Sequence, residues 1–494
     1  MAETPSTKKS VIQSPHVWAF TTYFAEGFPY TIIRMISSVF FRDRSVSLEG
    51  IGLTSLFGIP WVLKFLWGPL IDEYSTKRNW MLSTQFLLLI MAIGAGFLSP
   101  VPSGVRIIGI LFFVGAFVAA THDIAIDGYY MEALDEKGQA KFVGYRVMAY
   151  RIAMMAGTGV IVTIGATAGW SVGFLSAGAV LFLLFTYHVL FLPRVERQKK
   201  ASLQLLRSLF TLRFLGLTLC AFAAVLLIRS FVPSFLDYMT PARVGMGLLA
   251  CLILLALLKE QIKSAFLNNR DSFYSKAFLS YMDREKMGLT LAFIIFMRTG
   301  ESMLTSMVSP FMVDLGIKVH YGWISGGVGL PFSIIGAMAG GWMISRYTLK
   351  RTIWPFLLAQ NFTNLLYMGL AFYLSRYVLL NTGAETMTPI GYANLVLVAS
   401  VHGFDQFAGG LGTAVLITFL MRTCLADYKA AHFAIGTGLM NLSGVFAGVL
   451  GGFLAGWLGY GVFFGISFLA SIPGMALVFF VPFLEPTERT NPEP

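Results

Sequence analysis

A short basic turn occurs twice in this chain, each time where a long apolar segment ends. The first copy reads Gly68-Pro-Leu-Ile-Asp72-Glu-Tyr-Ser-Thr-Lys77-Arg78, and the second reads Gly341-Trp-Met-Ile-Ser345-Arg-Tyr-Thr-Leu-Lys350-Arg351. The matched positions are all 273 residues apart. Such a duplication within an array of apolar segments predicts two similar lobes of membrane helices, with a path for a solute between them.

The composition agrees with a membrane location. Of the 494 residues, 56% are hydrophobic and 12% are charged, whereas soluble domains carry about 25% charged residues. The formal net charge is +11, which raises the question of a nucleic-acid partner. The basic residues fall in short turns between apolar runs, so we interpret them as signals of membrane topology and expect no nucleic acid.

Apolar runs of sufficient length predict an all-α polytopic membrane protein. A helix needs about 20 residues to cross the hydrocarbon, and no alternating pattern typical of a strand barrel is present. Fourteen candidate spans result: 16–41, 51–71, 80–98, 106–130, 142–166, 170–192, 214–234, 244–258, 288–312, 321–345, 352–375, 391–421, 431–455 and 459–483.

The distribution of lysine and arginine predicts the orientation of these spans. With the N-terminus in the cytoplasm, 24 of the 36 basic residues lie in cytoplasmic segments and six lie in the opposite loops. This asymmetry follows the positive-inside rule and places both termini in the cytoplasm. The polar residues 1–14 precede a long apolar run without a small-residue cleavage site, so we expect a first span and no removed signal peptide.

Two features complete the predicted organisation. A second repeat, Gly58-Ile-Pro60-Trp against Gly329-Leu-Pro331-Phe, supports a six-helix lobe at residues 1–193 and another at 288–494. Between them, residues 194–287 form an insert of two spans and a polar stretch, whose end is either an interfacial helix or a solvated linker. The three cysteines lie in or at the end of apolar stretches without a CxxC pair, so we expect neither a metal site nor a disulfide.

Three longer motifs indicate a family. They are Phe65-Leu-Trp67-Gly-Pro-Leu-Ile-Asp72, His122-Asp123-Ile-Ala-Ile-Asp127-Gly, and Phe407-Ala-Gly-Gly-Leu-Gly-Thr-Ala-Val-Leu-Ile-Thr-Phe-Leu-Met421. With these motifs, the chain from about 16 to 483 resembles the AmpG-type muropeptide permeases and the acetyl-CoA transporters of the major facilitator superfamily. The resemblance implies a proton-driven importer of anhydro-muropeptides in the bacterial inner membrane, without a cofactor. Glu26 and Arg34 add charges that depart from the family pattern in the first span.

Carboxyl groups inside predicted spans are candidates for proton coupling, because an intramembrane charge costs roughly 2.5–3.5 kcal/mol on insertion scales. Asp123 and Asp127 are four residues apart and therefore share one helix face. Glu26 lies beside Gly27 and Pro29, which can open the backbone where it lines a cavity. The structural alternatives are a permanent ion pair for Glu26 and a salt bridge to a neighbouring turn for Asp127.

Basic residues in the first lobe are candidates for binding an anionic substrate. A guanidinium can hold a carboxylate through two hydrogen bonds, and an ammonium acts as a point charge. The resemblance implies that spans 1, 2, 4 and 5 face a central cavity. Arg146 and Arg151 are five residues apart, so they need not both face it, and one may instead compensate an aspartate. The candidates are Arg34, Lys64, Tyr145, Arg146 and Arg151.

The second lobe and the repeated turn supply further candidates. Arg298, Glu301, Asp405, Gln406 and Asn441 are polar residues within spans, although Arg298 and Glu301 also suit a pair within one helix. Glycines recurring every four residues from Gly444 to Gly456 predict close helix packing. Gly68, Asp72, Lys77 and Arg78 form the first basic turn, where a contact made in one state only would act as a conformational gate.

Other functions remain open at this point. A carrier of acetyl-CoA or another anionic solute, or an exporter of drugs or metabolites, would share these features. A membrane acyltransferase would need a histidine and carboxylate or metal cluster, and His122-Asp123 lacks the spacing of a zinc site. No Walker loop is present, so ATP does not drive the protein directly. We therefore expect a monomeric, non-enzymatic transporter of an anionic amphiphile, with protons and the lipid bilayer as its other partners.

Overall fold

The structure is a computed structural model that describes residues 11–64, 67–68, 71, 74–134, 136–195, 273–284, 286–378, 389–425 and 429–484. Within these residues the regular structure is helical and contains no strand. The predicted all-α class is confirmed for the described part of the chain. The predicted insert of two spans, at 214–258, lies outside the described residues.

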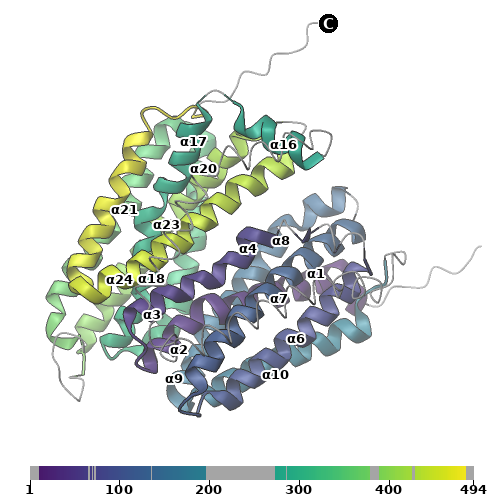
Figure 1. Ribbon diagram of the computed structural model, residues 1–494, viewed down its shortest axis with the longest axis horizontal. Coiled ribbons are helices and arrows are strands. Elements are labelled where there is room, and N and C mark those ends of the chain that lie inside the picture. Colours follow the sequence, from purple (N-terminus) through teal and green to yellow (C-terminus); the bar gives the residue numbers. More distant parts are fainter. Residues whose placement is uncertain are drawn as a thin grey trace, which may run out of the picture. The chain divides into compact units, whose positions relative to one another are not determined.

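The chain divides into two compact units (Figure 1). Unit 1 comprises Met1–Phe40 and Leu63–Leu236, and unit 2 comprises Phe41–Val62 and Asp237–Pro494. The segment Phe41–Val62 therefore packs with unit 2, a placement that the predicted division at 193 and 287 did not include. That division into two six-helix lobes stays a prediction.

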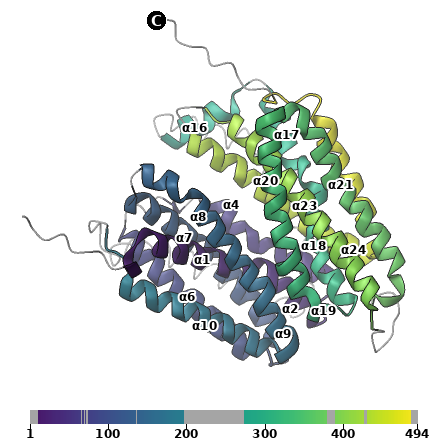
Figure 2. The same cartoon turned by 180° about the vertical axis from the view of Figure 1, so that it is seen from behind.

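In unit 1, Pro15 begins the first helix directly after Ser14, a favourable position because its missing N–H would be unpaired there. Thr76 caps α6 by accepting a hydrogen bond from the amide of Asn79 at 3.1 Å. Helices α6 and α10 lie side by side, as do α1 and α8 (Figures 1 and 2). The helices of unit 1 are α1 (Pro15–Thr31), a π-helical turn (Ile32–Ile36), α2 (Ser37–Asp43, which crosses into unit 2), α6 (Lys77–Leu98), α7 (Gly104–Ala133), α8 (Glu136–Met155), a π-helical turn (Ala156–Ile161), α9 (Val162–Ala168) and α10 (Trp170–Phe191).

Unit 2 contains longer helices. Its last helix, α24, bends at Gly459, where φ is 73°, a left-handed value that favours glycine. The helices are α3 (Leu48–Leu53), a 3₁₀ turn (Thr54–Gly58), α4 (Ile59–Leu63, which ends in unit 1), α16 (Phe273–Met282), α17 (Met287–Met297), α18 (Thr299–Asp314), α19 (Lys318–Tyr321), a π-helical segment (Gly322–Gly329), α20 (Leu330–Tyr347), α21 (Leu349–Tyr373), a 3₁₀ turn (Ser375–Tyr377), α23 (Tyr392–Arg422) and α24 (Lys429–Leu477).

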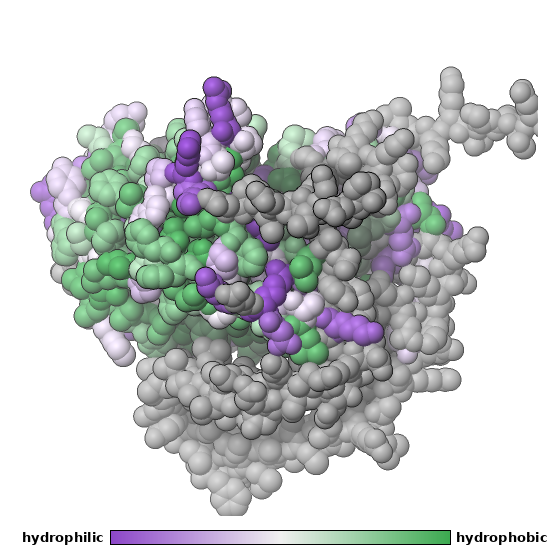
Figure 3. Space-filling model, turned by 90° about the horizontal axis from the view of Figure 1, so that it is seen from above, coloured by the Kyte–Doolittle hydropathy of each residue, from purple (hydrophilic) through white to green (hydrophobic). Residues whose placement is uncertain are grey.

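Eight described helical stretches are long and apolar enough to cross a membrane. They carry large exposed apolar side chains such as Phe97, Ile110, Leu183 and Met338, and apolar surface covers much of the described face in Figure 3. Such a surface suits lipid. Predicted spans 16–41 and 352–375 also coincide with helices, α1 to α2 and α21. The number fourteen stays a prediction.

An ion network joins the segment Phe41–Val62 to the rest of unit 2. Arg42 donates two 2.6 Å hydrogen bonds to the carboxylate of Asp314, which also accepts one from Tyr460 at 2.6 Å. Lys318 donates to Asp43 at 2.5 Å. Helix α3 then meets α24 so closely that a Cβ added to Gly452 would lie 2.6 Å from the Cα of Gly52. The predicted glycine stripe thus serves helix packing.

This close contact yields a first prediction. Gly452→Ala should lower the thermal stability of the purified protein by roughly 1–3 kcal/mol, because the added methyl overpacks the α3–α24 contact. The matched control is Gly369→Ala in α21, where no atom lies within 4 Å of the added Cβ. That control should keep or slightly raise the melting temperature in detergent. Equal melting temperatures of the two variants would contradict the close contact between α3 and α24.

Candidate functional site

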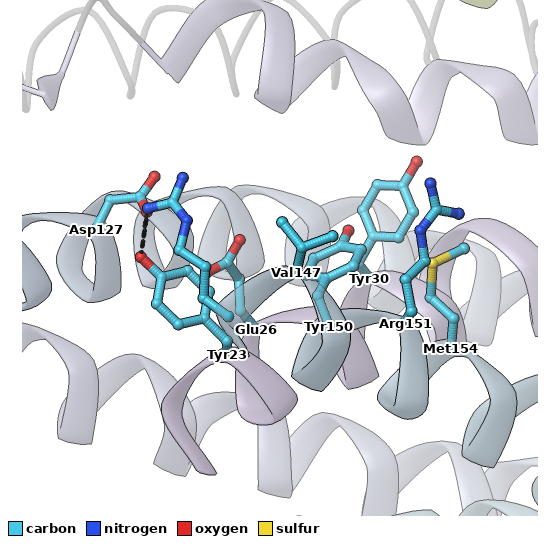
Figure 4. A pocket seen from close by; sticks show the side chains of 9 residues that line it. Tyr23, Glu26, Tyr30, Asp127, Val147, Tyr150, Arg151 and Met154 are labelled. Carbon is cyan, nitrogen blue, oxygen red and sulfur yellow. Dashed lines mark hydrogen bonds and ion pairs between the residues drawn. The ribbon is translucent and has the colours of Figure 1, made fainter. Parts of the chain in front are cut away.

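A polar cavity of about 370 Å³ opens within unit 1 (Figure 4). Three helices supply its walls: α1 and α8 contribute most of the side chains, and α7 contributes an aspartate. The α1 residues are spaced three and four apart, which places them on one helix face. The lining residues are Tyr23, Glu26, Tyr30, Asp127, Arg146, Val147, Tyr150, Arg151 and Met154.

A hydrogen-bonded triad occupies one side of this cavity. The hydroxyl of Tyr23 donates to Oδ1 of Asp127 at 2.8 Å and accepts from Nη1 of Arg146 at 2.9 Å. Arg146 also lies 3.4 Å from the Asp127 carboxylate, and its guanidinium stands over the ring of Tyr23 at 5.0 Å. Tyr23 and Asp127 point toward one another in Figure 4. Tyr23 therefore bridges Arg146 and Asp127, whose direct contact is long.

A second ion pair lies behind the triad. Lys64 donates a hydrogen bond to Oδ2 of Asp123, and Asp123 is buried one helical turn from Asp127. Glu26 belongs to the same group, and its Oε2 is buried without a hydrogen-bond partner among the described residues. Neighbouring carboxylates repel one another unless one of them carries a proton.

The backbone of α1 is adapted to this arrangement. Gly27 lets α8 approach, since a Cβ there would lie 2.8 Å from the carbonyl oxygen of Tyr150. Pro29 lies inside α1 and lacks an N–H, and the helix widens into the π-helical turn Ile32–Ile36 just after it. π-Helical turns are frequent at functional sites. The helix continues without a break through this region, so its backbone is widened there and not opened.

The chemistry of the cluster follows from its charges. Three carboxyl groups meet two cations, Lys64 and Arg146, with Arg151 further along the same cavity wall. Adding a proton to one carboxyl weakens its ion pair and releases the cation for another anion. The cluster can therefore take up a proton and bind a substrate carboxylate together. The described residues contain no cluster of metal-ligating side chains.

The structure places the other first-lobe candidates away from this cavity. Arg34 lies in the π-helical turn after α1, and Gly68 lies in the first basic turn. Tyr145 packs against the rings of His16, Phe20 and Phe142 and does not line the cavity. A contact between any of these residues and a substrate stays a prediction.

The basic turn anchors helix ends. Arg78 donates hydrogen bonds to the backbone oxygens of His188, Val189 and Leu192 at the end of α10, at 3.2, 2.9 and 3.1 Å. Lys77 is buried and donates to the carbonyl of Ile71 at 3.1 Å. Asp72 lies outside the described residues. The gating role of the turn stays a prediction, and its present contacts are those of a helix cap.

In unit 2 the candidates form a separate polar group. Arg298 donates two hydrogen bonds to the Glu301 carboxylate, at 2.8 and 2.9 Å, and Gln360 donates a third. Asp405 is buried and accepts from its neighbour Gln406 at 3.3 Å. Asn441 is exposed on α24. The structure thus brings Arg298 and Glu301 together and leaves Asn441 apart.

Several lining residues were missed by the sequence analysis: Tyr23, Tyr30, Val147, Tyr150 and Met154. Uncharged side chains carry no insertion penalty large enough to mark them as unusual in a membrane helix. Their spacing from the charged candidates was the one sequence signal that could have placed them on the same helix faces. Tyr23 and Tyr30 flank Glu26 at three and four residues, and Tyr150 follows Arg146 by four.

Several known proteins resemble this chain in sequence over most of its length. The family model described as Major Facilitator Superfamily matches residues 19–259. The anhydromuropeptide permease of Escherichia coli strain K12 is 24% identical over 464 residues, covering 92% of this chain and 77% of that protein. An uncharacterized protein of Haemophilus influenzae is 26% identical, with 96% of each covered, and putative transporter AmpG 4 of Rickettsia conorii is 19% identical, with 84% of each covered. The resemblance to AmpG-type permeases of the major facilitator superfamily is confirmed.

Solved structures agree with this fold. A peptide transporter POT in complex with sulfate superposes with a TM-score of 0.64 at 11% identity, covering 95% of this chain and 94% of that one. The xylose transporter XylE from E. coli, in an inward open conformation, superposes with a TM-score of 0.58 at 13% identity, with 97% and 98% covered. At these identities the match establishes the all-helical, major facilitator-like fold. The proteins that this chain resembles in sequence and in fold are named as transporters or permeases.

The pair of Lys64 and Asp123 yields a second prediction. Lys64→Met should destabilise the protein by roughly 2 kcal/mol, because Asp123 then stays buried without its cation. This is less than for a fully buried pair, since the Lys64 side chain is 35% exposed. The double variant Lys64→Met with Asp123→Asn should regain most of the loss in a thermal unfolding assay. A double variant less stable than Lys64→Met alone would contradict the pairing.

Proposed function

We propose that this protein is a secondary active transporter that imports anhydro-muropeptides into the cytoplasm together with protons. The observation that carries the proposal is the unit 1 cavity, in which two carboxyl groups and two guanidinium groups meet around a space of about 370 Å³. Relatives named anhydromuropeptide permease and AmpG support the substrate. The proposed location is the bacterial inner membrane, with both termini in the cytoplasm.

The lining chemistry suits a substrate that is part sugar and part acidic peptide. Arg146 and Arg151 can each hold a carboxylate through paired hydrogen bonds. The rings of Tyr23, Tyr30 and Tyr150 offer flat apolar faces with hydroxyl groups at their edges. An anhydro-muropeptide carries carboxylates on its peptide and rings in its sugars, so both halves find a complementary surface.

Proton coupling follows from competition for Arg146. In the present state Asp127 and the Tyr23 hydroxyl hold this guanidinium. A proton on Asp127 weakens that hold, and the free guanidinium then gains more by binding the substrate carboxylate. Substrate and proton thereby stabilise the same state, which is the condition for symport. Lys64 and Glu26 extend the same competition to Asp123.

A third prediction tests the transport itself. Full-length protein in liposomes should accumulate a radiolabelled anhydro-muropeptide when the outside is more acidic than the inside, since the proton gradient supplies the driving force. Accumulation should collapse when an ionophore dissipates the gradient. Competition by unlabelled acetyl-CoA, a simple sugar and a lipophilic drug tests the alternative substrates. Uptake that proceeds equally without a gradient would refute proton symport.

A fourth prediction concerns Asp123. Asp123→Asn keeps the size of the side chain but cannot exchange a proton, so gradient-driven accumulation should fall by about tenfold or more while the amount of folded protein is unchanged. The matched control is Asp283→Asn, at an exposed position in the turn after α16. The control should transport like the unaltered protein. Unchanged accumulation with Asp123→Asn would remove Asp123 from the coupling role.

A further inference from the structure

A row of buried polar side chains runs through unit 2 between α21 and α23. On α21 the row occupies one face, at positions 360, 363 and 367, and on α23 it continues at positions 402 and 405. All five side chains are buried, as is Glu301 of α18 beside them. We call this set the polar row: Glu301, Gln360, Thr363, Tyr367, His402 and Asp405. It spans about two turns of α21, or about 10 Å.

The row contains two hydrogen-bonded pairs. Gln360 donates to the Glu301 carboxylate, and the hydroxyl of Tyr367 is 2.9 Å from Nδ1 of His402. Helices α18, α21 and α23 pack against one another here, and Gly409 of α23 leaves room for Glu301, whose Oε1 would lie 3.1 Å from an added Cβ. A chain of donors and acceptors of this kind can pass a proton.

The two carboxyl groups of the row have different surroundings. The Glu301 carboxylate accepts three hydrogen bonds, two of them from Arg298. Asp405 is buried with no lysine or arginine paired to it in the described part of the chain, and it accepts a hydrogen bond from the neutral amide of Gln406. The other titratable groups facing it are Glu301, Tyr367 and His402. A buried carboxylate without a cation is costly, whereas a buried carboxylic acid is not.

Unsatisfied atoms in and beside the row form an independent observation. Nε2 of His402 and Oε1 of Gln360 are both buried without a hydrogen-bond partner among the described residues. Each costs about 1–3 kcal/mol if it stays without a partner, and a water or a proton-bearing group that reached it would remove that cost. The His402 nitrogen faces Gly329, where an added Cβ would lie 2.7 Å away. Gly329 ends the π-helical segment Gly322–Gly329.

We propose that Asp405 is a second proton-carrying carboxyl, loaded and emptied through the polar row with the help of water at His402. It acts in unit 2, apart from the carboxyl cluster that lines the cavity of unit 1. The proton moves between the Asp405 carboxyl and water, and no covalent bond other than O–H is formed or broken. The inference extends the proposed proton-coupled transport, but its first test does not depend on the substrate.

The first experiment is infrared difference spectroscopy of the purified full-length protein in liposomes during a pH titration. The carbonyl stretching band of protonated carboxylic acids should lose a component in Asp405→Asn that is present in the unaltered protein. Asp405→Glu should restore a band in this region. Ser400→Ala, an exposed position on α23, is the control and should match the unaltered protein. A spectrum of Asp405→Asn that superposes on the unaltered one overturns the proposal.

The second experiment separates coupling from binding. In the same liposomes, Asp405→Asn should lower gradient-driven accumulation of a radiolabelled anhydro-muropeptide by about tenfold, while exchange of labelled for unlabelled substrate continues. A proportional loss of both activities, with a normal melting temperature, would make Asp405 a binding residue and overturn the proposal. If the unaltered protein carries no muropeptide, the proposed function fails, and the infrared result still decides the role of Asp405.

Discussion

A charge inside a membrane helix must find a partner, and this requirement organises the described structure. The penalty of a bare charge amounts to several kcal/mol, so opposite charges are drawn together across helices. The chain meets the requirement repeatedly: the pairs are Lys64–Asp123, Arg146–Asp127, Arg298–Glu301 and Arg42–Asp314. Glu26 and Asp405 lack such a pair in the described residues, and they are the groups for which a proton is the natural partner.

The ion pairs also mark where the chain passes from one unit to the other. Arg42 and Asp314 hold the segment Phe41–Val62 within unit 2, and unit 1 resumes at Leu63. Lys64 is the second residue after that crossing and is held at once to Asp123 of α7. A change in the protonation of Asp123 therefore acts on the part of the chain that links the units.

The sequence predicted the charged part of the site better than its uncharged part. Asp123 and Asp127 were expected on one helix face from their spacing, and the structure places them there in contact with separate cations. Whether Tyr145 or Tyr150 lines the cavity depends on the rotation of α8 about its axis. The packing of α8 against Gly27 sets this rotation, and residue spacing alone does not reveal it. The placement of Phe41–Val62 in unit 2 depends on partners more than 250 residues away, such as Asp314, and no local pattern encodes them.

The two halves of the duplicated chain have come to use their buried acids differently. Glu301 is held by two hydrogen bonds from the arginine that precedes its helix, whereas Glu26 has no ion pair among the described residues and leaves one oxygen without a hydrogen-bond partner. A locked acid is a fixed charge that orients its neighbours, and an unlocked acid can change state. In unit 2 the acid that can change its protonation state, in our proposal, is Asp405 of α23. Within unit 2, the position of one arginine, Arg298, thus separates the paired acid, Glu301, from the acid that we propose to bind a proton, Asp405.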